Sequence, residues 1–187
     1  MRALSVPGKA TAAAPAAGGH AALSEPWFWF MTAVVVIQGG HVVEHIVQLV
    51  QVTMLGVPDQ DALGFLGYLI QFNGTEEWLH LGYNTFYLLA LYALVVPLWR
   101  IKGTVLPHWA FWFFLAASVW LETWHMVEHG VIIANVIANS GCPCPGIGDA
   151  ALGVSDTVLH FFYNALAYAG VAYAYVLVVR DRATSAS

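Results

Sequence analysis

The chain has 187 residues, of which 59% are hydrophobic and 9% charged, and its formal net charge is −5. Soluble domains average about 45–50% apolar and about 25% charged residues, so this composition excludes an ordinary soluble protein and indicates a single-domain membrane protein. The sequence has no basic face, which excludes nucleic acid as a partner.

Residues 1–26 are rich in Ala, Gly and Pro, with Arg2 and Lys9 near the start. No continuous apolar run precedes Trp27, so the composition predicts a disordered tail and not a cleavable signal peptide. We therefore expect the first apolar segment to serve as its own insertion signal.

Four apolar segments follow, each long enough to supply the roughly 20 residues that cross a bilayer core. They occupy residues 27–55, 78–99, 109–137 and 157–179. The sequence therefore predicts an all-α integral membrane protein with four transmembrane helices. In this interpretation residues 100–108 form a turn between two helix pairs, and residues 181–187 form a C-terminal tail.

The charges between these segments are distributed asymmetrically. All six basic residues lie in the N-terminal tail, the 100–108 turn and the C-terminal end, as Arg2, Lys9, Arg100, Lys102, Arg180 and Arg182. The loops 56–77 and 138–156 contain acidic residues and no basic ones. The positive-inside rule then predicts that both termini and the turn are cytoplasmic and that both loops lie outside the plasma membrane.

The only two cysteines, Cys142 and Cys144, form a C-x-C pair in the second outward loop. Such a pair can bind a soft metal, form a strained disulfide or link to another chain. The sequence leaves these alternatives open. The C-x-C pair differs from the C-x-x-C-H motif of covalent haem attachment.

The motif H-x-x-E-H occurs twice, at residues 41–45 and 125–129. Each copy is followed by a second shared segment, L-H-L-G-Y-N at 79–84 and L-H-F-F-Y-N at 159–164. An ionisable side chain at membrane depth costs at least about 2.5 kcal/mol, so a duplicated set indicates a functional site. The duplication predicts two helix-hairpin repeats, 27–99 and 109–180, related by a pseudo-two-fold axis along the membrane normal in a four-helix bundle.

Helical geometry places the polar residues of each repeat on facing surfaces. At about 100° per residue, the two His of each motif lie about 40° apart, with the Glu about 60° to the other side. The second helix of each repeat carries an acid, a His and an Asn at i, i+4 and i+8. At about 1.5 Å per residue these rows lie about 20–25 Å from the cytoplasmic helix ends, toward the outer side. Converging rows of this kind build metal sites in helix bundles.

Imidazole and carboxylate are ligands for iron, zinc, copper and manganese. The set is larger than one ion accepts, so we predict two ions, iron or copper, with zinc as an alternative. The predicted ligands are His41, Glu44, His45, His80, His125, Glu128, His129 and His160. Glu44 and Glu128 are also predicted to act catalytically, as bridging carboxylates or bases. Glu76, Asn84, Asp156 and Asn164 are predicted to orient the imidazoles from outside the ligand set.

Two other interpretations of the histidines stay open at this point. They could join helices by hydrogen bonds, as polar side chains do within membranes. They could instead hold haem through paired axial His. The carboxylate in each motif favours a bare metal cation over a porphyrin.

The leading functional hypothesis is a non-haem di-metal oxidase or oxygenase that acts on a membrane lipid or another lipophilic small molecule near the outer leaflet. A redox partner or a second copy of the chain would be its protein partner, and Tyr83 and Tyr163 would supply protons or electrons. The alternatives are a metal-ion carrier, a zinc hydrolase, a haem cytochrome and an accessory subunit of a membrane complex. The hydrolase alternative follows from the inverzincin motif, in which the Glu of H-x-x-E-H is the general base.

Overall fold

A computed structural model describes residues 22–70, 76–139 and 146–187, and within these ranges the chain is helical with no β-strand. The elements in chain order are α1 (Glu25–Thr53), η1 (Asp59–Asp61), α2 (Gly64–Ile70), α3 (Glu76–Arg100), α4 (His108–Phe113), η2 (Phe114–Trp120), α5 (Leu121–Ala138), α6 (Ile147–Leu152) and α7 (Asp156–Ser185). The all-α prediction is confirmed.

Three helices are long and apolar enough to cross a membrane, namely Glu25–Thr53, Trp78–Arg100 and Asp156–Ser185. They coincide with three of the four predicted spans, as expected for a membrane protein. The remaining predicted span, 109–137, is helical throughout but is divided among α4, η2 and α5. η2 is a π-helical segment. Such segments are rare and often lie beside functional sites.

The helix starts follow local sequence signals. α1 begins after Ser24 with Pro26 in its first turn, where proline's missing N–H costs no hydrogen bond. Ser155 caps α7, because its Oγ accepts a hydrogen bond from the Val158 N–H at 3.3 Å. The starts of α1 and α7 are therefore fixed by residues that lie just before the apolar segments.

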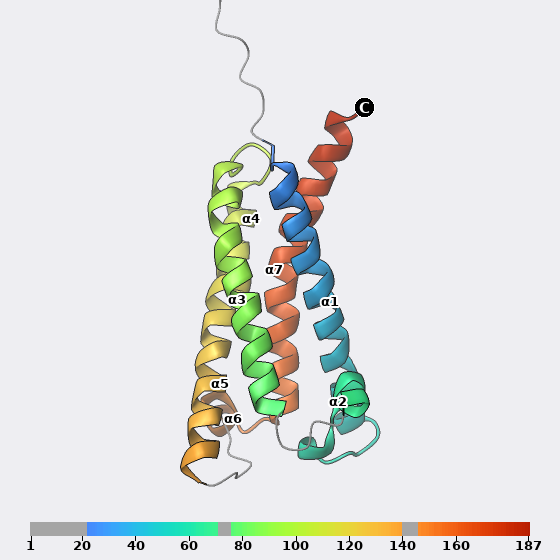
Figure 1. Cartoon of the computed structure of the whole chain (residues 1–187), viewed down its shortest axis with the longest axis vertical. Helices are drawn as coiled ribbons and strands as arrows, with labels where there is room; N and C mark the ends of the chain where they lie inside the picture. The colour runs from blue at the N-terminus through green and yellow to red at the C-terminus, as the bar shows by residue number, and fades with distance from the viewer. Residues whose placement is uncertain (1–21, 71–75, 140–145) are drawn as a thin grey trace, which may run out of the picture.

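The long helices α1, α3, α5 and α7 run side by side along the long axis of the molecule (Figure 1). The start of α1, the turn between α3 and α4, and the end of α7 lie at one end, and α2 and α6 lie at the other (Figure 1). This arrangement matches the predicted grouping of termini and turn against the two loops. Which end faces the cytoplasm stays a prediction.

The interior of the bundle is divided along its length. Toward the end that carries the turn between α3 and α4, the buried side chains are apolar and include Met31, Leu91, Leu94, Leu98, Phe111, Phe114, Val171, Ala174 and Val178. Toward the α2 and α6 end, the buried side chains include most of the polar residues that the repeats share. Large apolar side chains such as Val36, Phe86, Trp120 and Phe162 are exposed on the outside, as lipid contact requires.

Gly170 of α7 packs directly against η2. A Cβ at this position would overlap Ser118 Oγ and lie 3.3 Å from the Ser118 backbone nitrogen. The Ser118 hydroxyl donates a hydrogen bond to the Ala167 carbonyl at 2.6 Å, so it is not free to rotate away without loss. Only glycine allows the two backbones to approach this closely.

We predict that Gly170→Ala lowers the free energy of unfolding by about 1–3 kcal/mol, because the added methyl group overpacks the α7–η2 contact. Gly130→Ala is the matched control, since a Cβ at Gly130 meets nothing within 4 Å. A helical Gly→Ala change without a clash is expected to stabilise by up to about 1 kcal/mol. Denaturant-induced unfolding in detergent measures both. Equal stabilisation by the two substitutions would contradict the packing described.

Candidate metal centre

The structure brings the six predicted histidine ligands into one cluster. The closest ring centroids are 4.5 Å apart for His41 and His45 on α1 and 4.6 Å apart for His125 and His129 on α5. His80 of α3 lies 5.9 Å from both His45 and His129. All four long helices contribute, since His160 comes from α7. Residues that are far apart in sequence therefore form a continuous group of imidazoles.

The tightest part of this cluster is the triad of His125, His129 and His160. One ring nitrogen from each lies within 4.8 Å of the other two, and all three residues are buried. A metal ion binds imidazole nitrogen at about 2.0–2.1 Å, so nitrogens on one ion lie within about 4 Å of one another. Small side-chain adjustments bring the triad to that spacing.

Two of the triad histidines have a carboxylate beside their ring nitrogen Nδ1. Glu122 Oε2 lies 3.3 Å from His125 Nδ1. His160 Nδ1 lies 2.9 Å from Asp156 Oδ1 and also 2.9 Å from the Asp156 backbone carbonyl, its hydrogen-bond partner. The opposite nitrogen of His125, Nε2, is buried and makes no hydrogen bond to the described residues. Metal-binding histidines have this arrangement, in which a carboxylate fixes one nitrogen and leaves the other for the ion.

The third histidine of the triad, His129, is contacted from α3. The Asn84 side-chain amide on α3 lies 3.0 Å from His129 Nε2. The amide can present either its oxygen or its nitrogen to the ring, since the two are related by a flip. With the oxygen toward the ring, Asn84 accepts a hydrogen bond from His129 Nε2–H, which leaves Nδ1 as the nitrogen available to a metal ion. Asn84 thus contacts an imidazole, as predicted, and couples the two halves of the bundle.

The corresponding first-half group, His41, His45 and His80, is more open. His41 Nε2 and His45 Nε2 are 3.1 Å apart, a hydrogen-bond distance. The His80 ring lies 6.2 Å from that of His41 and is only half-buried. The two halves therefore supply the same three histidines in different geometries.

Sequence reasoning missed Glu122 as a member of the site. It is fully buried and lies three residues before His125, on the same helix face. Gln38 stands three residues before His41 and is its equivalent in the first repeat. The shared offset from the first His of each motif is the sequence signal that identifies both positions.

Gln38 has different contacts from Glu122. Its Nε2 donates to Asn164 Oδ1 at 2.9 Å, and its Oε1 accepts from the Tyr83 hydroxyl at 3.2 Å. Asn164 was predicted to orient an imidazole side chain, but its own Nδ2 donates to the His160 backbone carbonyl at 3.0 Å. Asn84 and Asn164 therefore occupy equivalent positions with different partners.

The two glutamates of the H-x-x-E-H motifs contact the short helices α2 and α6. Glu44 Oε1 accepts from the Leu66 N–H at 2.7 Å. Glu128 accepts from the Ile147 N–H at 2.6 Å and from the Gly148 N–H at 2.5 Å, with a different oxygen for each. These contacts tie α2 to α1 and α6 to α5. Ligation or base catalysis by either glutamate stays a prediction.

A glycine in α6 makes the Glu128 contact feasible. A Cβ on Gly148 would lie 2.5 Å from Glu128 Oε1 and 3.0 Å from the Tyr163 hydroxyl. Contacts under about 3 Å force one group to move. The Glu128 carboxylate therefore packs directly against the backbone of α6.

Two aromatic side chains flank the cluster. The Tyr83 ring stacks on His41 with the centroids 4.1 Å apart. The Tyr163 ring lies 5.2 Å from that of His125, and its hydroxyl accepts a hydrogen bond from Trp124 Nε1 at 3.0 Å. Both tyrosines that the repeats share thus lie beside the first histidine of a motif.

Three predicted features fall outside what the structure describes. Cys142 and Cys144 lie in the segment 140–145, and the side chain of Glu76 is also outside the description. Their predicted roles stay predictions.

In comparisons with known proteins, no family model, curated protein or solved structure matches this chain. Any functional conclusion therefore rests on the arrangement of its own residues.

We predict that Glu122→Gln weakens metal binding about 10- to 100-fold, because the neutral amide polarises the His125 imidazole less than a carboxylate does. Titration of the metal-free protein with cobalt(II), followed by absorbance in competition with a chelator, measures this affinity. Glu25→Gln is the control, since Glu25 lies in the first turn of α1, far from the cluster. An unchanged affinity in Glu122→Gln would show that this carboxylate does not support a metal ligand.

Proposed function

We propose that the chain is an integral-membrane metalloprotein that binds two metal ions, one at each group of three histidines. The observation that carries this proposal is the convergence of six histidines from four helices, with His125 held by Glu122 through Nδ1 and its buried Nε2 turned inward. Hydrogen bonding between helices accounts poorly for this arrangement, because a buried nitrogen without a partner costs free energy that a bound metal would recover.

In this proposal the four long helical segments form a transmembrane bundle of two parallel hairpin repeats. Support comes from the common end shared by both termini and the turn between α3 and α4 (Figure 1). Arg100, Lys102, Arg180 and Arg182 belong to that end. The positive-inside rule assigns it to the cytoplasm. The histidine cluster then lies toward the outer face.

The donor set favours copper over iron. The carboxylates of Glu44 and Glu128 accept hydrogen bonds from backbone amides, which leaves imidazole as the main donor near the cluster centre. Imidazole-rich sites suit copper and zinc, and copper stands above iron and zinc in the general order of divalent affinities. We therefore place copper first, zinc second and carboxylate-bridged iron third.

The reaction we propose is oxidation of a lipophilic substrate by dioxygen. In an oxygenation of this kind one oxygen atom enters a C–H bond and the other leaves as water, with two electrons and two protons drawn from an external donor such as a membrane quinol. Copper held by the two histidine groups would supply the redox chemistry of this reaction. Tyr83 against His41 and the Trp124–Tyr163 pair beside His125 are redox-active side chains placed to carry electrons or protons to the cluster.

The other candidate functions have less support. A metal carrier needs a polar path, whereas the interior beyond Asn84 toward the α3–α4 turn is filled by apolar side chains such as Leu91, Leu94 and Val171. A haem between the histidines needs room for a macrocycle, whereas the His129 ring contacts the rings of both His125 and His160. Zinc hydrolysis requires a free glutamate base, and both motif glutamates have backbone partners.

We predict about two metal ions per chain in protein purified under metal-replete conditions, measured by elemental analysis. His45→Ala and His129→Ala should each retain about one ion, because each removes a ligand from only one group. His108→Ala is the matched control, since His108 is exposed at the start of α4 and outside the cluster. Absence of metal from the wild type, or loss of metal in His108→Ala as well, would contradict the proposal, and a Soret band would replace it with haem binding.

A further inference from the structure

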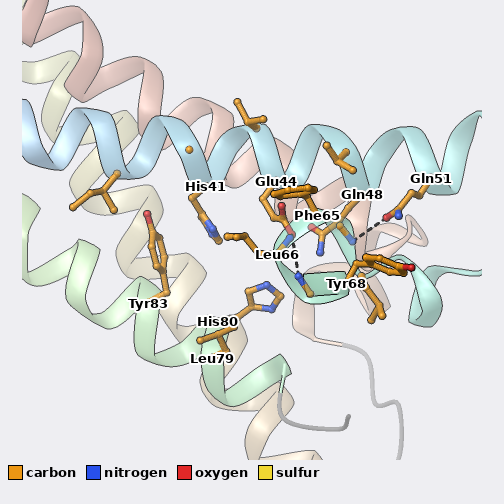
Figure 2. Close-up of a pocket in the computed structure, with 17 residues that line it drawn as sticks. His41, Glu44, Gln48, Gln51, Phe65, Leu66, Tyr68, Leu79, His80 and Tyr83 are labelled. Carbon is orange, nitrogen blue, oxygen red and sulfur yellow. Dashed lines mark hydrogen bonds between the residues drawn. The ribbon is translucent and has the colours of Figure 1, made fainter. Parts of the chain in front are cut away.

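A large cavity adjoins the first-half histidines. It encloses about 740 Å³ between α1, α2 and α3. Pockets that hold small molecules measure about 300–1,000 Å³. Figure 2 shows Tyr83 at one end, Gln51 and Tyr68 at the other, and His41 and His80 between them. The cavity therefore passes directly over part of the histidine cluster.

The cavity walls are mostly apolar and open toward the outside of the bundle. Val43 of α1, Phe65 of α2 and Leu79 of α3 line the cavity and are also exposed, by 58%, 60% and 43% respectively. In a membrane these side chains meet lipid tails. A molecule dissolved in the bilayer can therefore enter between α1 and α3 without crossing water.

The electrostatics of the cavity favour an uncharged occupant. Among the described lining residues Glu44 is the only Asp or Glu, and its Oε1 accepts from the Leu66 and Gly67 amides at 2.7 and 3.4 Å. His41 and His80 are the histidines that line the cavity. No Lys or Arg lines the cavity. An anionic head group would therefore lie beside a carboxylate without a counter-charge, at high cost in a low-dielectric site.

The shape of the cavity favours an extended occupant. Its lining follows α1 from Ile37 to Gln51, which corresponds to about 21 Å at 1.5 Å per residue. Gln48 and Gln51 add uncharged amide groups at the end next to α2. A chain with a neutral polar head can place that head between these amides and pass its tail over His41 and His80.

We propose that this cavity binds a neutral single-chain lipid, with its uncharged head at the Gln48 and Gln51 end and its chain against His41, His80 and Tyr83. That the bound chain is the molecule oxidised rests on the proposed function, whereas the binding itself does not. Val127, which is equivalent to Val43, is exposed by 46% but does not line the cavity.

The test is photolabelling of the metal-free full-length protein in lipid nanodiscs with a diazirine-bearing analogue of hexadecanol, followed by mapping of the labelled residues by mass spectrometry. We expect labels on α1 between residues 37 and 51 and on Leu66 and Leu79. Hexadecanol should compete at least about tenfold better than palmitate at neutral pH, because palmitate carries a charge that the cavity does not neutralise. Val43→Trp should reduce labelling about tenfold by filling the cavity, and the matched variant Val127→Trp should leave it unchanged.

Three results would overturn the inference: labels spread evenly over the exposed faces of all helices, equal competition by palmitate, or equal losses in Val43→Trp and Val127→Trp. Because the metal-free protein is used, a failure of labelling does not bear on metal binding. Conversely, cavity labelling with no metal in the replete protein would leave the lipid site standing and contradict the proposed function alone.

Discussion

Burial of five imidazoles and half-burial of a sixth, that of His80, inside an apolar helix bundle is the constraint on which the rest of this structure depends. Polar groups removed from water must find partners or cost free energy, and each histidine here is placed where other polar side chains of the site meet it. Glu122, Asp156 and Asn84 contact the histidines of the triad, while Glu44 and Glu128 accept hydrogen bonds from the short helices α2 and α6. The apolar half of the bundle contributes packing alone. The molecule is thus divided into a half that holds the helices together and a half that holds the site.

The two H-x-x-E-H motifs give the two histidine groups both their likeness and their differences. The same spacing places His41 and His45, like His125 and His129, on one face of a helix. The departure lies in their neighbours, because Gln38 in the first half corresponds to the acidic Glu122 in the second. In the first half α2 lies over a wide cavity beside His41 and His80, whereas in the second half the triad is closed. The His125, His129 and His160 triad is therefore enclosed, whereas His41 and His80 face a cavity.

Much of this could be predicted from the sequence, since helical periodicity and hydrophobic length depend only on local residues. The all-helical fold, three of the spans and the gathering of the histidines follow from such patterns. The predicted span 109–137 is helical but differs from the other three. Glu122 and Glu128 lower its hydropathy, and the π-helical segment η2 divides it. The contacts of Glu44 and Glu128 with backbone amides were not predictable from the motif, because they depend on how loops without helical periodicity fold back. The cavity is formed by the same loop, so the sequence did not predict it either.

X-ray absorption spectroscopy of the copper-loaded protein tests the central claim most directly, because it reports the atoms bound to the metal without reference to activity. The account predicts about three imidazole nitrogens per ion at about 2.0 Å. Multiple scattering from the outer atoms of the imidazole rings would identify these ligands as histidine. It also predicts that His129→Ala binds about half as much copper per chain, while the remaining ion keeps about three imidazole nitrogens. A first shell of sulfur, or one dominated by carboxylate oxygen and unchanged in His129→Ala, would contradict the assignment of the metal centre to the histidine cluster.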